Sequence, residues 1–69
     1  MLTQLPLTFI DKRTAQIALT EFRKRYRIAL RGAVVIGPDY HKAYTLHVPL
    51  GGTGFSPAEM ASAIRAGNY

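Results

Sequence analysis

A change of hydrophobic period near Tyr26 limits the folds that are open to this chain. Before it, Ala15, Ala18, Leu19 and Phe22 recur at three- and four-residue spacing, which is the period of an amphipathic helix. After it, apolar residues alternate with polar or small ones, as in a half-buried strand. A helix followed directly by a strand predicts an α+β domain, and the 69 residues leave room for a single hydrophobic core.

The helical period extends from Lys12 to about Arg25. Asp11 is a favourable N-cap, because its carboxylate can accept a backbone N–H that is unpaired at a helix start. Tyr26 continues the apolar stripe, which predicts that its ring lies in the core. Ile17 lies off the stripe, and we expect it to contact the N-terminal segment.

Residues 1–10 are predicted to form an edge strand or an arm. Leu5, Leu7 and Phe9 alternate with other residues as in a strand, and Pro6 favours an edge because it lacks a ladder N–H. An apolar edge can pair with a second chain, so a homodimer through Leu5, Leu7 and Phe9 is one expectation. Packing of this strand within its own domain is the alternative.

Two further strands are predicted to form an antiparallel hairpin. The first extends from Tyr26 to Ile36 and carries Arg27 and Arg31 on its polar face. The second extends from Tyr40 to Val48, and Gly37-Pro38-Asp39 between them is a turn signal.

Ser56-Pro57-Ala58-Glu59 predicts the start of a second helix. The serine and the glutamate can form a capping box, and the proline stands at the first helical position. Met60 and Ile64 then face the core, and Gly67 ends the helix. The predicted class is therefore α+β, a small single domain of (β)αββα order with an antiparallel hairpin sheet packed against two helices.

The charge of the chain favours an anionic partner. Nine Lys and Arg against four Asp and Glu give a net charge of +5. The predicted contact residues for nucleic acid or another partner are Arg23, Lys24, Arg25, Arg27, Arg31, Lys42 and the stacking ring of Tyr40. For Arg23, Lys24 and Arg25 a structural role is the alternative, because cations complement the dipole in the last turn of a helix.

No residue set predicts catalysis or a cofactor. His41 and His47 are separated by about 20 Å on an extended strand, so they cannot share a metal ion, and there is no cysteine. His41 alone could act as a general acid or base, although a solvated side chain is the simpler interpretation. Residues 51–54 precede a helix N-terminus and could hold a phosphate, with a flexible connector as the alternative.

Four short segments have the order and spacing of a known family. They are Arg31-Gly32, Val48-Pro49-Leu50, Phe55-Ser56-Pro57 and Ala63 to Gly67. On these segments the stretch from Thr14 to Gly67 resembles HicA-type mRNA-interferase toxins, which have a double-stranded-RNA-binding-domain-like αβββα fold. The family's catalytic histidine follows the Arg-Gly-like pair, where this chain has Ala33-Val34-Val35. The resemblance therefore implies RNA binding without cleavage, and it carries over no catalytic residue.

Two functions follow as expectations. The first is a small, basic, non-enzymatic nucleic-acid-binding protein that favours RNA or backbone contacts. The second is a protein-binding inhibitor or adaptor of phage type, whose basic face and edge strand meet an acidic protein. No apolar run approaches the roughly 20 residues of a membrane span, so no membrane partner is expected and the location predicted is cytoplasmic.

Overall fold

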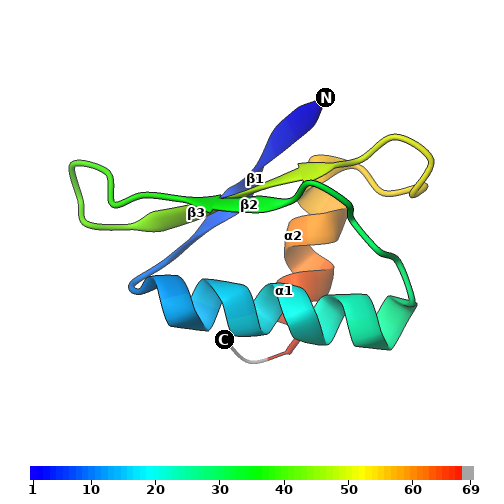
Figure 1. Cartoon of the computed structure of the whole chain (residues 1–69), viewed down its shortest axis with the longest axis horizontal. Helices are drawn as coiled ribbons and strands as arrows, with labels where there is room; N and C mark the ends of the chain where they lie inside the picture. The colour runs from blue at the N-terminus through cyan, green and yellow to red at the C-terminus, as the bar shows by residue number, and fades with distance from the viewer. Residues whose placement is uncertain (68–69) are drawn as a thin grey trace.

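The computed structural model describes residues 1–67 of the chain. Its elements are β1 (Leu2–Phe9), α1 (Lys12–Tyr26), β2 (Val34–Ile36), β3 (Tyr44–Pro49) and α2 (Pro57–Arg65). The predicted α+β class and the order of the elements are both confirmed (Figure 1).

The three strands form an antiparallel sheet in the order β1-β3-β2. β3 is antiparallel to both neighbours, so β1 and β2 run parallel to each other with β3 between them. This is a split β–α–β arrangement, in which α1 makes the crossover. The predicted hairpin of β2 and β3 is confirmed, as is the edge position of β1.

The pairing of β1 with β3 contains a bulge around Pro6. Gln4 pairs with His47 and Thr8 pairs with Thr45, so three residues of β1 stand opposite Leu46 alone. Pro6 is thus in the irregular part of the ladder, where a missing N–H costs least. Because the bulge adds two residues, the alternation of buried and exposed side chains along β1 continues through it.

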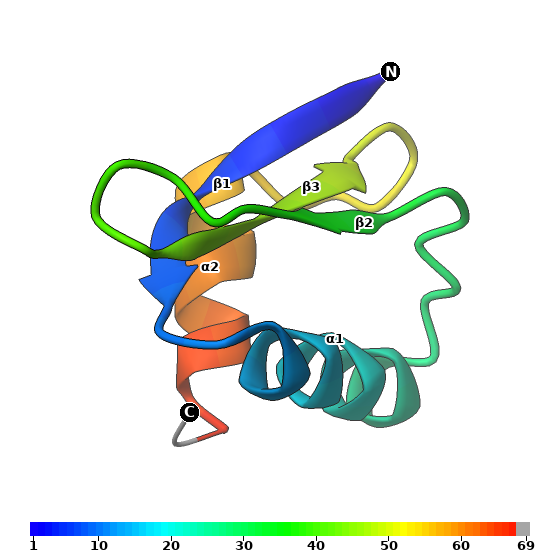
Figure 2. The same ribbon diagram turned by 60° about the vertical axis from the view of Figure 1, so that its left-hand side comes forward.

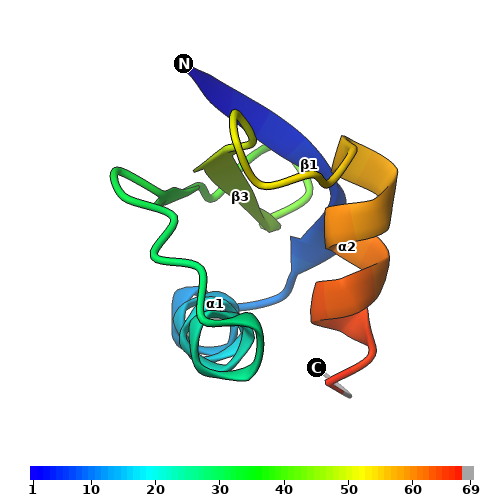
Figure 3. The same cartoon turned by 90° about the vertical axis from the view of Figure 1, so that its right-hand side faces the viewer.

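Both helices lie on one face of the sheet (Figures 2 and 3). The buried core consists of side chains from the sheet, from both helices and from Leu30. Leu5, Leu7 and Phe9 point into this core with exposed fractions of 1%, 6% and 5%. They pack with Leu46 of β3 and Met60 of α2, which are fully buried. The three β1 side chains therefore belong to the chain's own core, and the expected dimer surface through them does not exist in this conformation.

Both helix starts are capped as predicted. The Asp11 carboxylate accepts the Thr14 backbone N–H at 2.7 Å and the Thr14 hydroxyl at 3.0 Å. At α2 the Glu59 N–H donates to Ser56 Oγ at 3.2 Å, while the Ser56 N–H donates to Glu59 Oε1 at 3.1 Å. These bonds satisfy N–H groups that a helix start would otherwise leave unpaired.

The prediction of a continuous strand from Tyr26 to Ile36 is wrong. Arg27 and Leu30 adopt left-handed backbone conformations with φ of 55° and 47°, and only Val34–Ile36 is extended in the sheet. Leu30 is 3% exposed, so this loop turns its side chain into the core. Arg27 and Arg31 consequently do not share a strand face.

Two smaller expectations also need correction. β3 begins at Tyr44 instead of Tyr40, because the Asp39 carboxylate organises the preceding residues into a loop. Ile17 does not pack on the N-terminal strand; its side chain is 44% exposed on the outer side of α1.

Candidate functional site

The consecutive cations at the end of α1 point in three directions. Successive helical residues are turned by about 100°, so three consecutive side chains cannot share one face of the helix. Arg23 lies beside Val34 of β2, Arg25 lies beside Ala63 of α2, and Lys24 is exposed to solvent. The three predicted contact residues therefore have three different surroundings.

Arg23 has a structural role. Its side chain is half-buried, and Nη2 donates to the Leu30 carbonyl oxygen at 3.2 Å, which ties the loop after α1 back to the helix. Nε is buried and has no hydrogen-bond partner among residues 1–67. This guanidinium is thus engaged with its own chain, through a loop carbonyl and not through the helix dipole that the structural alternative invoked.

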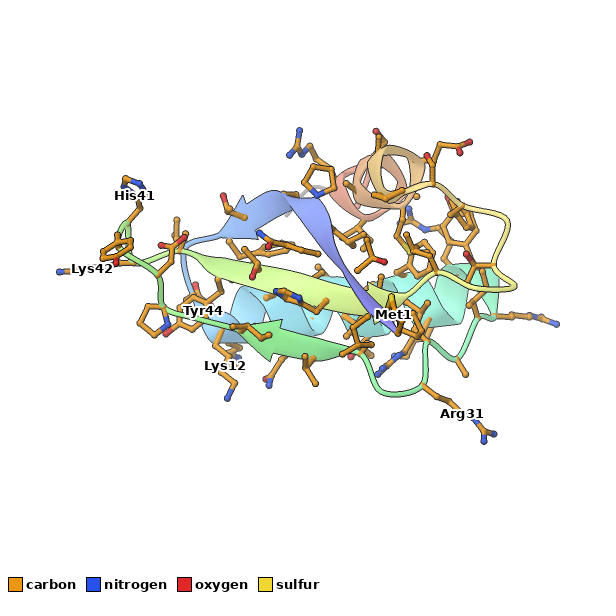
Figure 4. The ribbon with its side chains drawn as sticks, turned by 90° about the horizontal axis from the view of Figure 1, so that it is seen from above. Met1, Lys12, Arg31, His41, Lys42 and Tyr44 are labelled. Carbon is orange, nitrogen blue, oxygen red and sulfur yellow. The ribbon has the colours of Figure 1, made fainter. Side chains whose placement is uncertain are left out.

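The remaining predicted cations fall into two groups at opposite ends of the molecule. Arg31 extends from one end, and Lys42 lies with His41 at the other (Figure 4). The long axis of the domain measures 32 Å. We call the first group the basic end; it consists of Lys24, Arg25, Arg27 and Arg31, all of them exposed.

The second group is presented by a hydrogen-bonded loop, which we call the hairpin tip (residues 39–43). The Asp39 carboxylate accepts the backbone N–H of His41 at 2.8 Å and that of Ala43 at 2.9 Å. These bonds, the one from Ala43 first, hold the pKa of Asp39 below its usual value. Tyr40, in the same loop, is fully exposed, as stacking on a base would require.

Tyr26 is a candidate that the sequence reasoning assigned to the core. Its ring packs on Phe22 at 4.7 Å and on Phe55 at 5.6 Å between centroids, yet the residue is 40% exposed. The ring therefore borders the basic end, between Arg25 and Arg27 in sequence. The sequence contains one signal for this partial exposure: Tyr26 stands at the end of the predicted helix, where a helix leaves the core.

The acidic side chains are used locally. Three of the four, Asp11, Asp39 and Glu59, accept hydrogen bonds at a helix start or a turn. Their pKa values are lowered chiefly by those bonds: from the Thr14 backbone, the Ala43 backbone and the Ser56 side chain, respectively. They remain ionised near neutral pH, but their partners are backbone and hydroxyl groups and not the cations.

The proposed phosphate position before α2 is occupied by the protein itself. Glu59 places its carboxylate at this helix N-terminus, which disfavours a second anion there. The preceding residues are also held in place, since Thr53 Oγ1 donates to the Leu50 carbonyl at 2.7 Å and accepts the Phe55 N–H at 3.2 Å. Residues 51–54 therefore form a hydrogen-bonded turn.

A groove of about 540 Å³ lies between α1 and the outer edge of β2. The α1 side chains that line it are Lys12, Gln16, Leu19, Thr20 and Arg23, and Ala33, Val34 and Val35 complete it. Lys12 lies beside the C-terminal end of β2 (Figure 4). The sequence reasoning did not identify this groove, because it joins residues about 20 positions apart that only the crossover brings together.

Comparison with known proteins gives no relative for this chain: no family model, no curated protein and no solved structure matches it. Neither helix described in residues 1–67 has the length and apolarity to cross a bilayer. In the same residues, no three His, Cys, Asp or Glu side chains converge as metal ligands would.

Proposed function

We propose that this protein binds nucleic acid without cleaving it, with the basic end in contact with backbone phosphates. One observation carries the proposal. The exposed cations of the basic end stand in the last turn of α1 and in the loop that follows it, as does the 40%-exposed Tyr26 at the end of the helix, while three of the four carboxylates are held by hydrogen bonds at helix starts and the hairpin tip.

Phosphate contacts need accessible cations, and they carry little sequence information. The basic end supplies cations on short, exposed segments on either side of the helix terminus. The Tyr26 ring beside them favours a single strand, whose unstacked bases can pack on an aromatic side chain. The resemblance to RNA-binding toxins favours RNA over DNA.

The hairpin tip is the second contact of the proposal. Tyr40 and Lys42 repeat the combination of an aromatic ring and a cation at the far end of the domain. A strand that bridges both ends would span the long axis of 32 Å.

Anisotropy of a labelled single-stranded RNA, titrated at several salt concentrations, tests this proposal. We expect the double variant Arg27→Glu/Arg31→Glu to weaken binding by at least about tenfold and to flatten the salt dependence, because phosphate contacts release counterions. Arg13→Glu/Arg65→Glu is the matched control, since it makes the same change of charge at exposed positions outside the basic end.

Equal losses in both double variants would mean that net charge, and not the basic end, determines affinity. Absence of binding to RNA and DNA of either strandedness at low salt would refute the function altogether. Tyr40→Ala should weaken binding by about fivefold or more if the hairpin tip stacks on a base.

A further inference from the structure

The outer edge of β2 is open. Within residues 1–67, β2 pairs with β3 alone, so its outward N–H and C=O groups have no strand partner. Val34 and Ile36 on the uncovered face of the sheet are 40% and 50% exposed. β1, by contrast, contains a proline and a bulge, two devices that discourage pairing with a further strand. β2 has neither a proline nor a bulge within Val34–Ile36; its length of three residues is the feature that limits pairing, so an added strand would also depend on side-chain contacts in the groove.

The wall opposite this edge is basic. Lys12 and Arg23 stand near the two ends of the groove on α1, with Gln16 and Thr20 between them, and no carboxylate of residues 1–67 lines it. Nη2 of Arg23 already donates to the Leu30 carbonyl oxygen, so this residue adds positive charge to the groove and not a free side chain. A ligand that supplies an anionic acceptor at each end would complement both cations.

We infer that the groove between α1 and β2 binds an extended acidic peptide segment of a partner protein, which adds to the sheet as a fourth strand beside β2. The backbone of a peptide matches the alternating N–H and C=O groups of a strand edge. A sugar–phosphate backbone lacks this alternation, so the strand edge selects a peptide over a nucleic acid.

The residue pattern of the peptide follows from the pleat. Side chains of an added strand alternate between the two faces. Those paired with Val34 and Ile36 would lie on the uncovered face, where apolar residues fit. The peptide residue between those two would point toward α1, opposite Val35. The two peptide residues on either side of this three-residue segment would point toward α1 as well.

Spacing assigns acidic residues to those flanking positions. Lys12 and Arg23 are eleven residues apart on α1, which is about 16 Å along the helix axis. Peptide positions four residues apart are about 13 Å apart, within reach of two long cationic side chains. The predicted motif is therefore acidic, apolar, any, apolar, acidic, and its symmetry makes it independent of strand direction.

This inference is independent of the nucleic-acid proposal, which rests on the basic end and the hairpin tip. Its probe is a fluorescein-labelled peptide of sequence Ser-Glu-Val-Thr-Val-Glu-Ser with blocked ends, titrated into the full chain. Amide NMR spectra recorded during the titration identify the residues that respond. We expect saturable binding with the largest shifts at Val34, Val35 and Ile36.

Two altered peptides test the mode of binding without changing the protein. N-methylation of the central threonine and of one valine removes backbone donors and should abolish binding. A peptide of the same composition with both glutamates at one end should bind more weakly, because it can reach only one of the two cations.

Lys12→Glu and Arg13→Glu form a matched pair on α1. Both positions are exposed and both changes alter the net charge equally, but only Lys12 lines the groove. We expect Lys12→Glu to weaken peptide binding at least roughly fivefold, the effect of a partly exposed ion pair, and Arg13→Glu to change it much less. Arg27→Glu/Arg31→Glu should keep peptide binding even where RNA binding is lost.

Three results would overturn the inference. They are no binding up to millimolar peptide by folded protein, unchanged affinity for the N-methylated peptide, or equal effects of Lys12→Glu and Arg13→Glu. Single-stranded RNA that displaces the peptide and shifts the same β2 amides would assign the groove to nucleic acid instead.

Discussion

Replacement of Arg23 separates the structural and the contact roles of the cations at the end of α1. The Arg23 guanidinium holds the Leu30 carbonyl at 3.2 Å, and it therefore stabilises a loop in which Leu30 adopts a φ of 47°. Arg23→Ala removes the hydrogen bond and the aliphatic stem together. Arg23→Met removes the hydrogen bond and the charge but keeps most of the stem.

The expected magnitude follows from three contributions. A hydrogen bond from a charged donor contributes about 1.5–3 kcal/mol, and the half-exposed position of Arg23 puts it at the lower limit. Packing of the stem adds roughly 1 kcal/mol. Removal of the unpartnered Nε–H raises the free energy of unfolding by about 1 kcal/mol or more, because a buried donor without an acceptor destabilises the folded state.

We therefore expect Arg23→Ala to lower the free energy of unfolding by about 1–1.5 kcal/mol and Arg23→Met to lower it by less than about 0.5 kcal/mol. A domain of this size loses about 4–8 °C in Tm per kcal/mol. Thermal unfolding followed by circular dichroism measures the difference, and hydrogen exchange should show faster exchange in residues 28–33 of Arg23→Ala.

Arg27→Met is the matched control, because it removes the same charge from an exposed residue of the basic end. It should leave Tm unchanged within a degree or two and weaken RNA binding more than Arg23→Met does. The reasoning fails if Arg23→Met and Arg27→Met weaken RNA binding equally while Arg23→Ala leaves Tm unchanged.

Two further predictions concern the acidic side chains. Ser56→Ala opens the capping box and should lower stability by about 1 kcal/mol, visible as a lower Tm, whereas Ser62→Ala on the exposed side of α2 should have little effect. Asp11, Asp39 and Glu59 have lowered pKa values in the folded state, so in acid the unfolded chain binds more protons than the folded chain. The free energy of unfolding should therefore fall once the pH drops below about 4, and these three groups should not change it near neutral pH. Urea titrations across this pH range measure the free energy of unfolding. Asp39→Asn should make its decline in acid smaller, and an unchanged pH dependence in this variant would contradict the prediction.

Local signals in the sequence were sufficient for the helices. The N-cap at Asp11 and the capping box of Ser56 and Glu59 depend on contacts within a single turn, so their chemistry can be recognised without knowledge of the fold. The edge position of β1 was equally accessible, because Pro6 cannot serve in the middle of a ladder.

The incorrect prediction of a strand from Tyr26 to Ile36 is explained by tertiary contacts. Apolar residues alternate there as in a strand, but Ile28 and Leu30 reach the core from a loop that bends through left-handed conformations. A side-chain bond across seven residues, from Arg23 to Leu30, holds this bend. Nothing in a two-residue period indicates such a contact.

The charge of the candidate site was predictable, but its distribution was not. Composition identified the cations, whereas their directions depend on the helical turn and on the end of α1 at Tyr26. The groove beside β2 depends on the crossover that brings Lys12 and Arg23 next to residues 33–35. That proximity is a property of topology, which the spacing of residues along the chain does not express.

The engagement of the carboxylates at helix starts and at the hairpin tip has a consequence for the energetics of the whole domain. Because the carboxylates are engaged elsewhere, the cations that give the chain its net charge of +5 largely repel one another. This repulsion disfavours the compact state. Dissolved salt relieves it, so ionic strength should stabilise the fold while it weakens an electrostatic complex. An anionic partner provides the same relief at the surface itself, and the domain should therefore be most resistant to unfolding when that partner supplies the missing counter-charge.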